Sequence, residues 1–225
     1  MMLGTNILDK LRQDRTKSVI DAQSHYDKGV KLVEQGRYPD ALLAFKQAIK
    51  AQSDFAEAQL ELGITYHKMR RHKDAIKALL AALKSRPGFV DAYKNLGIVY
   101  DSSGQFFDAL KMYLSAIRLR PDDLELRKNL GFVYFNLGSY AESIKAYKQA
   151  LRIAPNDASV HYNLGLVYLD MNDRESAFEE QRLLKEAGHH DTATLLLDEI
   201  ERQAWHLNQG RKKVVEGENT NPVPN

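Results

Sequence analysis

The segment YKNLGIVY, residues 93–100, decides the fold because its pattern returns at a fixed interval of 34 residues. Its glycine belongs to a column of five: Gly29, Gly63, Gly97, Gly131 and Gly165. A leucine stands one residue before each of the last four glycines, and a tyrosine stands three residues after each of them. An interval of this size is typical of solenoids, in which each unit packs only against its neighbours.

Each unit is expected to hold two helices joined by a short turn. Tyr93, Leu96, Gly97 and Tyr100 are spaced i, i+3, i+4 and i+7, which places them on one stripe of a helix. Gly97 lacks a side chain, so a second helix can approach closely there. This closeness must offset the roughly 1 kcal/mol that glycine costs inside a helix.

The second helix of this unit has a facing stripe of small and aromatic residues: Ala109, Tyr113 and Ala116. Gly104 or Gly138 is expected to end a first helix, where the chain needs a positive φ. Pro121 and Pro155 open the next turn, since proline cannot continue a helix. The units therefore run over residues 22–55, 56–89, 90–123, 124–157 and 158–191.

This order of large, small and proline positions resembles the tetratricopeptide repeat, a helix–turn–helix unit. The resemblance covers residues 22–191 and extends to bacterial-type scaffold proteins and to the repeat region of the O-linked N-acetylglucosamine transferases. It implies an all-α fold, a right-handed superhelical solenoid of five repeats closed by a C-terminal capping helix. It says little about function, because many unrelated systems use this scaffold.

The terminal units depart from the pattern. The first has His25 and Lys28 at positions where later units carry longer or apolar residues. The fifth has Gln181 in place of an aromatic residue and His189 in place of proline. We interpret these polar residues as the outer faces of end units.

The two flanks are expected to differ. Residues 1–21 form a partly helical extension, which either lengthens the first repeat helix, forms a helix of its own or is a solvated leader. A stripe at helical spacing predicts a capping helix over residues 191–208: Ala193, Leu196, Leu197, Ile200, Ala204 and Leu207. Residues 209–225 are poor in apolar residues and contain glycine, proline and asparagine, which predicts a disordered tail.

Composition argues against several classes of function. The 225 residues include 32 Lys and Arg against 30 Asp and Glu, a net charge of +2, which argues against nucleic acid as a partner. The chain has no cysteine, hence no disulfide and no thiolate chemistry. No apolar run approaches the ~18 residues that span a bilayer, and the start lacks the pattern of a signal peptide. We therefore expect a cytoplasmic protein without membrane insertion.

Motifs for chemistry are missing from the sequence. It contains no phosphate-binding loop, dinucleotide fingerprint, nucleophile elbow or paired catalytic carboxylates. None of the seven histidines lies three or four residues from another on a helix. The basic run from Lys68 to Lys73 lies at the turn of the second unit, and we interpret it as a solvated loop. We predict no enzyme activity, no catalytic residue, no cofactor and no metal.

The side of each first helix opposite its buried stripe is the candidate site, because in the related repeats it lines the concave groove that holds peptides. Counted from the start of each unit, position 6 is Asp27, Glu61, Asn95, Asn129 or Asn163. The three asparagines resemble the ladder of the O-linked transferases, in which amides hold a peptide backbone through their donor and acceptor groups. The alternative is that asparagine at this position is simply common in the family.

Position 9 is apolar in every unit: Val30, Ile64, Ile98, Phe132 and Leu166. On a face expected to contact water, these residues predict an exposed strip, which Phe135, Tyr162 and Leu169 widen. The alternative is that they pack between adjacent first helices. Lys94 and Lys128 at position 5 are expected to attract a carboxylate of the partner, although the asparagines of a chaperone-type carboxylate clamp are missing at position 9.

These features predict a scaffold or adaptor that binds a peptide or helix of a partner protein in a groove centred on units three to five. The predicted binding residues are Lys94, Asn95, Ile98, Lys128, Asn129, Phe132, Phe135, Tyr162, Asn163 and Leu166. Two alternatives remain open. One is a structural scaffold that assembles into a homo-oligomer, and the other is a substrate-binding accessory to a separately encoded glycosyltransferase.

Overall fold

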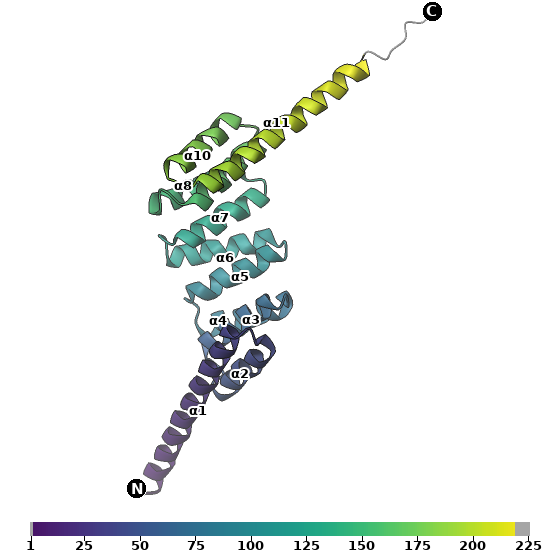
Figure 1. Cartoon of the computed structure of the whole chain (residues 1–225). Coiled ribbons are helices and arrows are strands. Elements are labelled where there is room, and N and C mark those ends of the chain that lie inside the picture. Colours follow the sequence, from purple (N-terminus) through teal and green to yellow (C-terminus); the bar gives the residue numbers. More distant parts are fainter. Residues whose placement is uncertain (1, 219–225) are drawn as a thin grey trace, which may run out of the picture. The chain divides into compact units, whose positions relative to one another are not determined.

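The computed structural model describes the backbone of residues 2–218 and the side chains of residues 12–206. Within residues 2–218 it contains eleven helices and no strand, which confirms the all-α prediction (Figure 1). The helices are α1 (Met2–Glu34), α2 (Tyr38–Ala51), α3 (Ala56–Lys68), α4 (His72–Ser85), α5 (Val90–Ser102), α6 (Phe106–Leu119), α7 (Leu124–Asn136), α8 (Tyr140–Ile153), α9 (Ala158–Asp170), α10 (Arg174–Glu186) and α11 (His190–Glu218). They form two compact structural units, each larger than a single repeat. The first unit ends at Leu126 and the second unit begins at Arg127.

The first unit consists of helical hairpins that pack in chain order. α1 packs on α2, α3 on α4 and α5 on α6, while α2 and α4 contact the first helix of the next hairpin. Consecutive first helices also touch, α1 with α3 and α3 with α5. A Cβ atom on Gly97 would lie 2.6 Å from the ring of Tyr113. The predicted close approach of the two helices at this glycine is therefore confirmed.

Each first helix ends in the same tight turn. φ is positive at the residues that close it: Gly36, Arg70, Gly104, Gly138 and Asn172. The next N–H donates back across the turn, as from Gln105 to the carbonyl of Tyr100 at 2.8 Å. This is the Schellman arrangement, which needs a left-handed residue. The prediction of positive φ at Gly104 and Gly138 is confirmed, and Arg70 adopts the same conformation with a side chain.

Replacing Arg70 with glycine is expected to raise the free energy of unfolding by about 1 kcal/mol. A residue with a side chain costs roughly 1–2 kcal/mol in the left-handed region, and glycine avoids this cost. Part of the gain is lost because glycine also increases the conformational entropy of the unfolded chain. Urea unfolding followed by circular dichroism measures the change. The reverse substitution, Gly104→Arg, should lower the free energy of unfolding by a similar amount. Equal stability of R70G and the natural protein would contradict the explanation.

The N-terminal extension continues the first repeat helix. α1 is unbroken from Met2, which agrees with the first of the three alternatives left open by the sequence, a lengthened first repeat helix. Its contact with the hairpin begins at Ser18, whose hydroxyl donates to the carbonyl of Ala51 at 2.5 Å, and Ala22 is the first fully buried residue among the described side chains. Residues 12–17 are exposed on the part of α1 before this contact.

In the second unit, α11 completes the hydrophobic core. It packs on both α9 and α10, and a Cβ atom on Gly165 would lie 2.5 Å from Leu196. Leu196 thus lies over this glycine as Tyr147 lies over Gly131. Gln181, which was expected on an outer face, is instead buried at 6% exposure; it is the equivalent of Tyr147 on the stripe of the second helix that faces the first.

The C-terminal helix also extends beyond its predicted end. The expectation of a disordered tail from residue 209 is wrong for residues 209–218, since α11 continues to Glu218. Gly210 by itself costs a helix only about 1 kcal/mol, which does not end it. The first proline after residue 209 is Pro222, which comes after the end of α11. The predicted disorder of residues 219–225 lies outside the described residues.

Candidate functional site

We define the first-helix face as positions 2, 5, 6, 9, 12 and 13 of each repeat, counted from the first residue of the 34-residue repeat. On α5 these are Asp91, Lys94, Asn95, Ile98, Asp101 and Ser102. Lys94, Asn95 and Ile98 are all half-buried there. The amide of Asn95 donates to the carbonyl of Asp91 at 2.7 Å. The ammonium nitrogen of Lys94 lies 3.9 Å from Oδ1 of Asp91, so both polar side chains turn toward the start of their own helix.

On α7, the lysine predicted to bind a partner takes part in an internal ion pair. Nζ of Lys128 lies 3.2 Å from Oδ2 of Asp157, the capping residue of α9. Burial alone would raise the pKa of Asp157, but hydrogen bonds from Ser159, from the N–H of Val160 and from Lys128 hold that pKa below its ordinary value. Lys128 therefore anchors α7 to the start of α9.

The aromatic residues of α7 differ in exposure. Phe132 is 42% exposed, which is large for a phenylalanine on a helix with a buried stripe. Phe135 is half-buried, and its ring centroid lies 6.0 Å from that of Tyr140 on α8. Asn129 is half-buried on the same helix. Phe132 thus extends outward from α7 while Phe135 joins the packing between α7 and α8.

On α9, the C-terminal helix covers part of the predicted site. Tyr162 and Leu166 are half-buried and pack against the cluster that contains Leu196 and Ile200 of α11. Leu169, which was expected to widen an exposed strip, is 5% exposed, and its carbonyl accepts a hydrogen bond from Gln203 of α11 at 2.6 Å. Asn163 is half-buried.

The expected exposed strip at position 9 is therefore wrong in this form. Val30 and Ile64 pack against the core of the first unit, Leu166 packs against that of the second, and Ile98 is half-buried. Packing between helices, the alternative left open by the sequence, explains these residues. Phe132 is the member of the row that remains exposed.

Two histidine contacts were not expected from the sequence. The rings of His67 and His72 lie 5.4 Å apart across the turn between α3 and α4. Burial lowers the pKa of His67, and electrostatic repulsion from His72 and Arg70 lowers it further. On α9, Nδ1 of His161 lies 2.6 Å from a carboxylate oxygen of Glu180. Spacings of i+3 and i+4 on one helix do not include His67 and His72, which are five residues apart. They also do not include His161 and Glu180, which lie on different helices. Among the described residues, no group of three or more metal-binding side chains is found.

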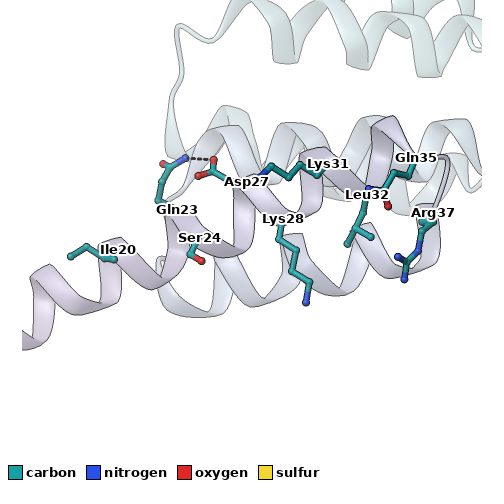
Figure 2. Close-up of a pocket in the computed structure, with 9 residues that line it drawn as sticks. All are labelled: Ile20, Gln23, Ser24, Asp27, Lys28, Lys31, Leu32, Gln35 and Arg37. Atoms are coloured by element: carbon teal, nitrogen blue, oxygen red, sulfur yellow. Dashed lines mark hydrogen bonds between the residues drawn. The ribbon is translucent and has the colours of Figure 1, made fainter.

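A pocket of about 760 Å³ lies along α1 rather than on the first-helix faces of later helices (Figure 2). Its lining includes Ser24, Lys28 and Lys31, in the places where α3 has the buried residues Ala58, Leu62 and Thr65. Lys28 is exposed, as expected for an outer face. On α1 the corresponding residues Ser24, Lys28 and Lys31 are exposed.

No described helix combines the length and the hydropathy required to cross a bilayer. The hairpins with a glycine at each helix crossing define a helical-repeat protein. Models of the tetratricopeptide repeat match residues 26–88, 60–123 and 158–187, and a TPR repeat model matches residues 133–172. The chain belongs to the tetratricopeptide-repeat family.

Several solved structures share this fold. A crystal structure of MamA protein, 25% identical, aligns with a TM-score of 0.70 over 75% of this chain and 92% of that chain. MamA from Desulfovibrio magneticus RS-1, 21% identical, gives 0.71 over 75% and 96%. YrrB, described as a TPR protein with an unusual peptide-binding site, gives 0.68 at 24% identity over 82% and 97%. A search of curated protein sequences finds no match.

Proposed function

We propose that this protein is a non-catalytic interaction scaffold whose first-helix face binds a segment of a partner polypeptide. The observation that supports this most directly is Phe132, a large apolar side chain that is 42% exposed on that face. Aromatic residues are enriched among the few that contribute most of the binding energy at protein interfaces. The fold adds support, because the family is generally non-catalytic and YrrB, which shares the fold, is described as having a peptide-binding site.

The polar residues around Phe132 suit a peptide backbone. Asn129 lies three residues before Phe132 on α7, and Asn163 has the same position on α9. Each amide offers both a donor and an acceptor, and each such bond contributes about 0.5–1.5 kcal/mol. In this proposal Phe132 provides the apolar contact, and the amides hold the chain beside it.

Replacing Phe132 with serine is expected to weaken capture of the partner by at least tenfold, since burial of a phenylalanine side chain is worth about 1.5–3 kcal/mol. The measurement is affinity capture from a lysate of the native host with quantitative mass spectrometry. The control is Phe107→Ser, because Phe107 is 71% exposed on the second helix α6. Equal capture by a folded F132S variant and by the natural protein would refute the role of this face.

A further inference from the structure

The outward side of α11 exposes two large apolar side chains. Leu195 is 57% and Trp205 is 59% exposed. Helical geometry places both on the side of α11 opposite the residues that join the core of the second unit, Ala193, Leu196 and Ile200. More than half of each apolar side chain therefore contacts water on a face that the fold leaves open.

The last repeat exposes a third apolar residue on the helix that pairs with α11. Phe178 of α10 has the position that Leu42, Ile76, Leu110 and Ile144 occupy in the preceding repeats, where all four are buried or half-buried. Phe178 is exposed. The last repeat thus exposes apolar surface that each earlier repeat buries at least in part, and surfaces of this kind mark interaction sites.

The exposed residues of α11 form a self-complementary series. Leu195, Asp198, Arg202 and Trp205 are spaced i, i+3, i+7 and i+10, which places them on one face of the helix. Counted from residue 200 in either direction, a charged residue comes second and an apolar residue fifth, and the two charges are opposite in sign. Under a two-fold axis, residue i of one chain contacts residue j of the other and j contacts i. An antiparallel copy of α11 centred at residue 200 therefore matches apolar with apolar and acid with base.

Both charged residues are available for this contact. Asp198 is exposed and forms no hydrogen bond or ion pair with a described residue. Arg202 is also exposed, and its Nη1 lies 2.9 Å from Oε1 of Glu199 on the same helix. That contact leaves Nε and Nη2 of Arg202 as donors for a second carboxylate.

Charge selects the antiparallel arrangement over the parallel one. A parallel pair would place Asp198 beside Asp198 of the second copy and Arg202 beside Arg202, and like charges repel. The antiparallel pair has two contacts between Asp198 and Arg202 instead. Exposed ion pairs contribute little affinity, so the contacts of Leu195 and Trp205 provide most of it, and tryptophan is enriched among residues that do so at interfaces.

We infer that this protein forms a symmetric dimer in which α11 packs antiparallel on α11 of a second copy, with Leu195 against Trp205 and Asp198 against Arg202. The inference goes beyond the proposed function, because this surface lies on α11 and not on the first-helix face around Phe132. A dimer holds two such faces. A partner with two copies of the recognised segment would then bind more tightly, because the second contact forms at a high effective concentration.

Sedimentation velocity of the full chain between about 1 µM and 1 mM tests the dimer. The natural protein should shift from the mass of one chain to that of two. Asp198→Arg brings like charges together, as does Arg202→Asp, so each variant should dimerise at least tenfold more weakly. An equal mixture of the two variants should recover the affinity, because opposite charges then meet at both contacts. The control Glu142→Arg reverses an exposed acid of α8 and should dimerise like the natural protein.

The register is tested by disulfide formation, since the chain has no cysteine of its own. Chains with Leu195→Cys and chains with Trp205→Cys should form a mixed disulfide when they are combined and oxidised. Each variant alone should form little, because two copies of residue 195 lie about 15 Å apart along antiparallel helices that rise 1.5 Å per residue.

The remaining outcomes overturn the inference. A chain that is monomeric at every concentration excludes the dimer, and capture of another protein through Trp205 by such a monomer assigns the face to a foreign partner. Failure of the mixed charge variants to recover affinity excludes the contact between Asp198 and Arg202. Disulfides within each cysteine variant in place of the mixed one exclude the antiparallel register. Phe132→Ser should leave the dimer intact, so failure of the dimer and failure of the scaffold proposal are observed separately.

Discussion

Replacing Glu180 with alanine should lower the free energy of unfolding by about 3 kcal/mol at pH 6, because it leaves a buried charge without its partner. The side chains of His161 and Glu180 are 7% and 10% exposed, and Nδ1 of His161 lies 2.6 Å from the carboxylate. Nε2 of the same ring lies 2.9 Å from the carbonyl oxygen of Pro155. Both neighbours are acceptors, so both ring nitrogens donate, and His161 is an imidazolium in the folded protein.

The loss should shrink as the pH rises. The hydrogen bond to Glu180 raises the pKa of His161 above its ordinary value, with burial opposing and the Pro155 carbonyl assisting. A histidine whose pKa is raised by folding contributes its full stabilisation at pH values below its pKa in the unfolded chain, about 6.5. This stabilisation is lost as the pH rises through its pKa in the folded protein. Urea unfolding of the natural protein and of E180A at pH 6 and pH 9 measures the difference.

A matched control comes from the chain itself. α3 and α4 have Gln59 and Ala78 where α9 and α10 have His161 and Glu180. The double variant His161→Gln/Glu180→Ala should therefore recover most of the stability lost by E180A and should show no extra dependence on pH in this range. A constant difference between E180A and the natural protein from pH 6 to pH 9 would refute the charged pair.

Replacing Gly97 with valine should lower the free energy of unfolding by about 3 kcal/mol or more. A Cβ atom at this position would lie 2.6 Å from Cε1 of Tyr113, whose side chain is 1% exposed and cannot move into solvent. Overpacking of this kind costs about 1–3 kcal/mol, and the branched side chain adds to it. Alanine should also destabilise, although helix propensity alone predicts a gain of about 1 kcal/mol.

Gly88 provides the control for this prediction. A Cβ atom there meets nothing within 4 Å, so Gly88→Ala should change stability by less than about 0.5 kcal/mol. Thermal unfolding followed by circular dichroism compares the variants on one scale. If Gly97→Ala stabilised the protein as propensity predicts, the close helix crossing would be excluded.

Much of the fold could be predicted because it depends on local periodicity. Gly97 and Tyr113 are placed by spacing within one hairpin, and Gly104 ends its helix through a conformation that glycine favours. Where the determining contacts come from a distant helix, the same reasoning failed. Leu169 was expected in an exposed strip, but it is buried and its carbonyl accepts a hydrogen bond from Gln203 of α11. Gln181 is likewise buried, and α11 continues to Glu218.

The candidate site was predicted less well than the fold. The spacing put Lys128, Phe132 and Leu166 on one face of their helices, yet it gave each of them the same expected exposure. Lys128 pairs with Asp157, Leu166 packs beside α11, and Phe132 is exposed. These outcomes depend on which neighbour each side chain meets, and a period of 34 residues carries no information about that.

By itself, the sequence determined the paired helices of the repeats, the turns at Gly104 and Gly138 and the close crossing at Gly97, since these follow from the periodicity within one hairpin. Tertiary structure alone decided which polar groups are paired. Glu57 pairs with Arg86 and His161 with Glu180, whereas Glu61 forms no ion pair with a described residue, and a period of 34 residues indicates none of these outcomes. The physical reason is that desolvation and pairing act through space, so equivalent positions in the repeat differ in charge environment wherever their neighbours differ.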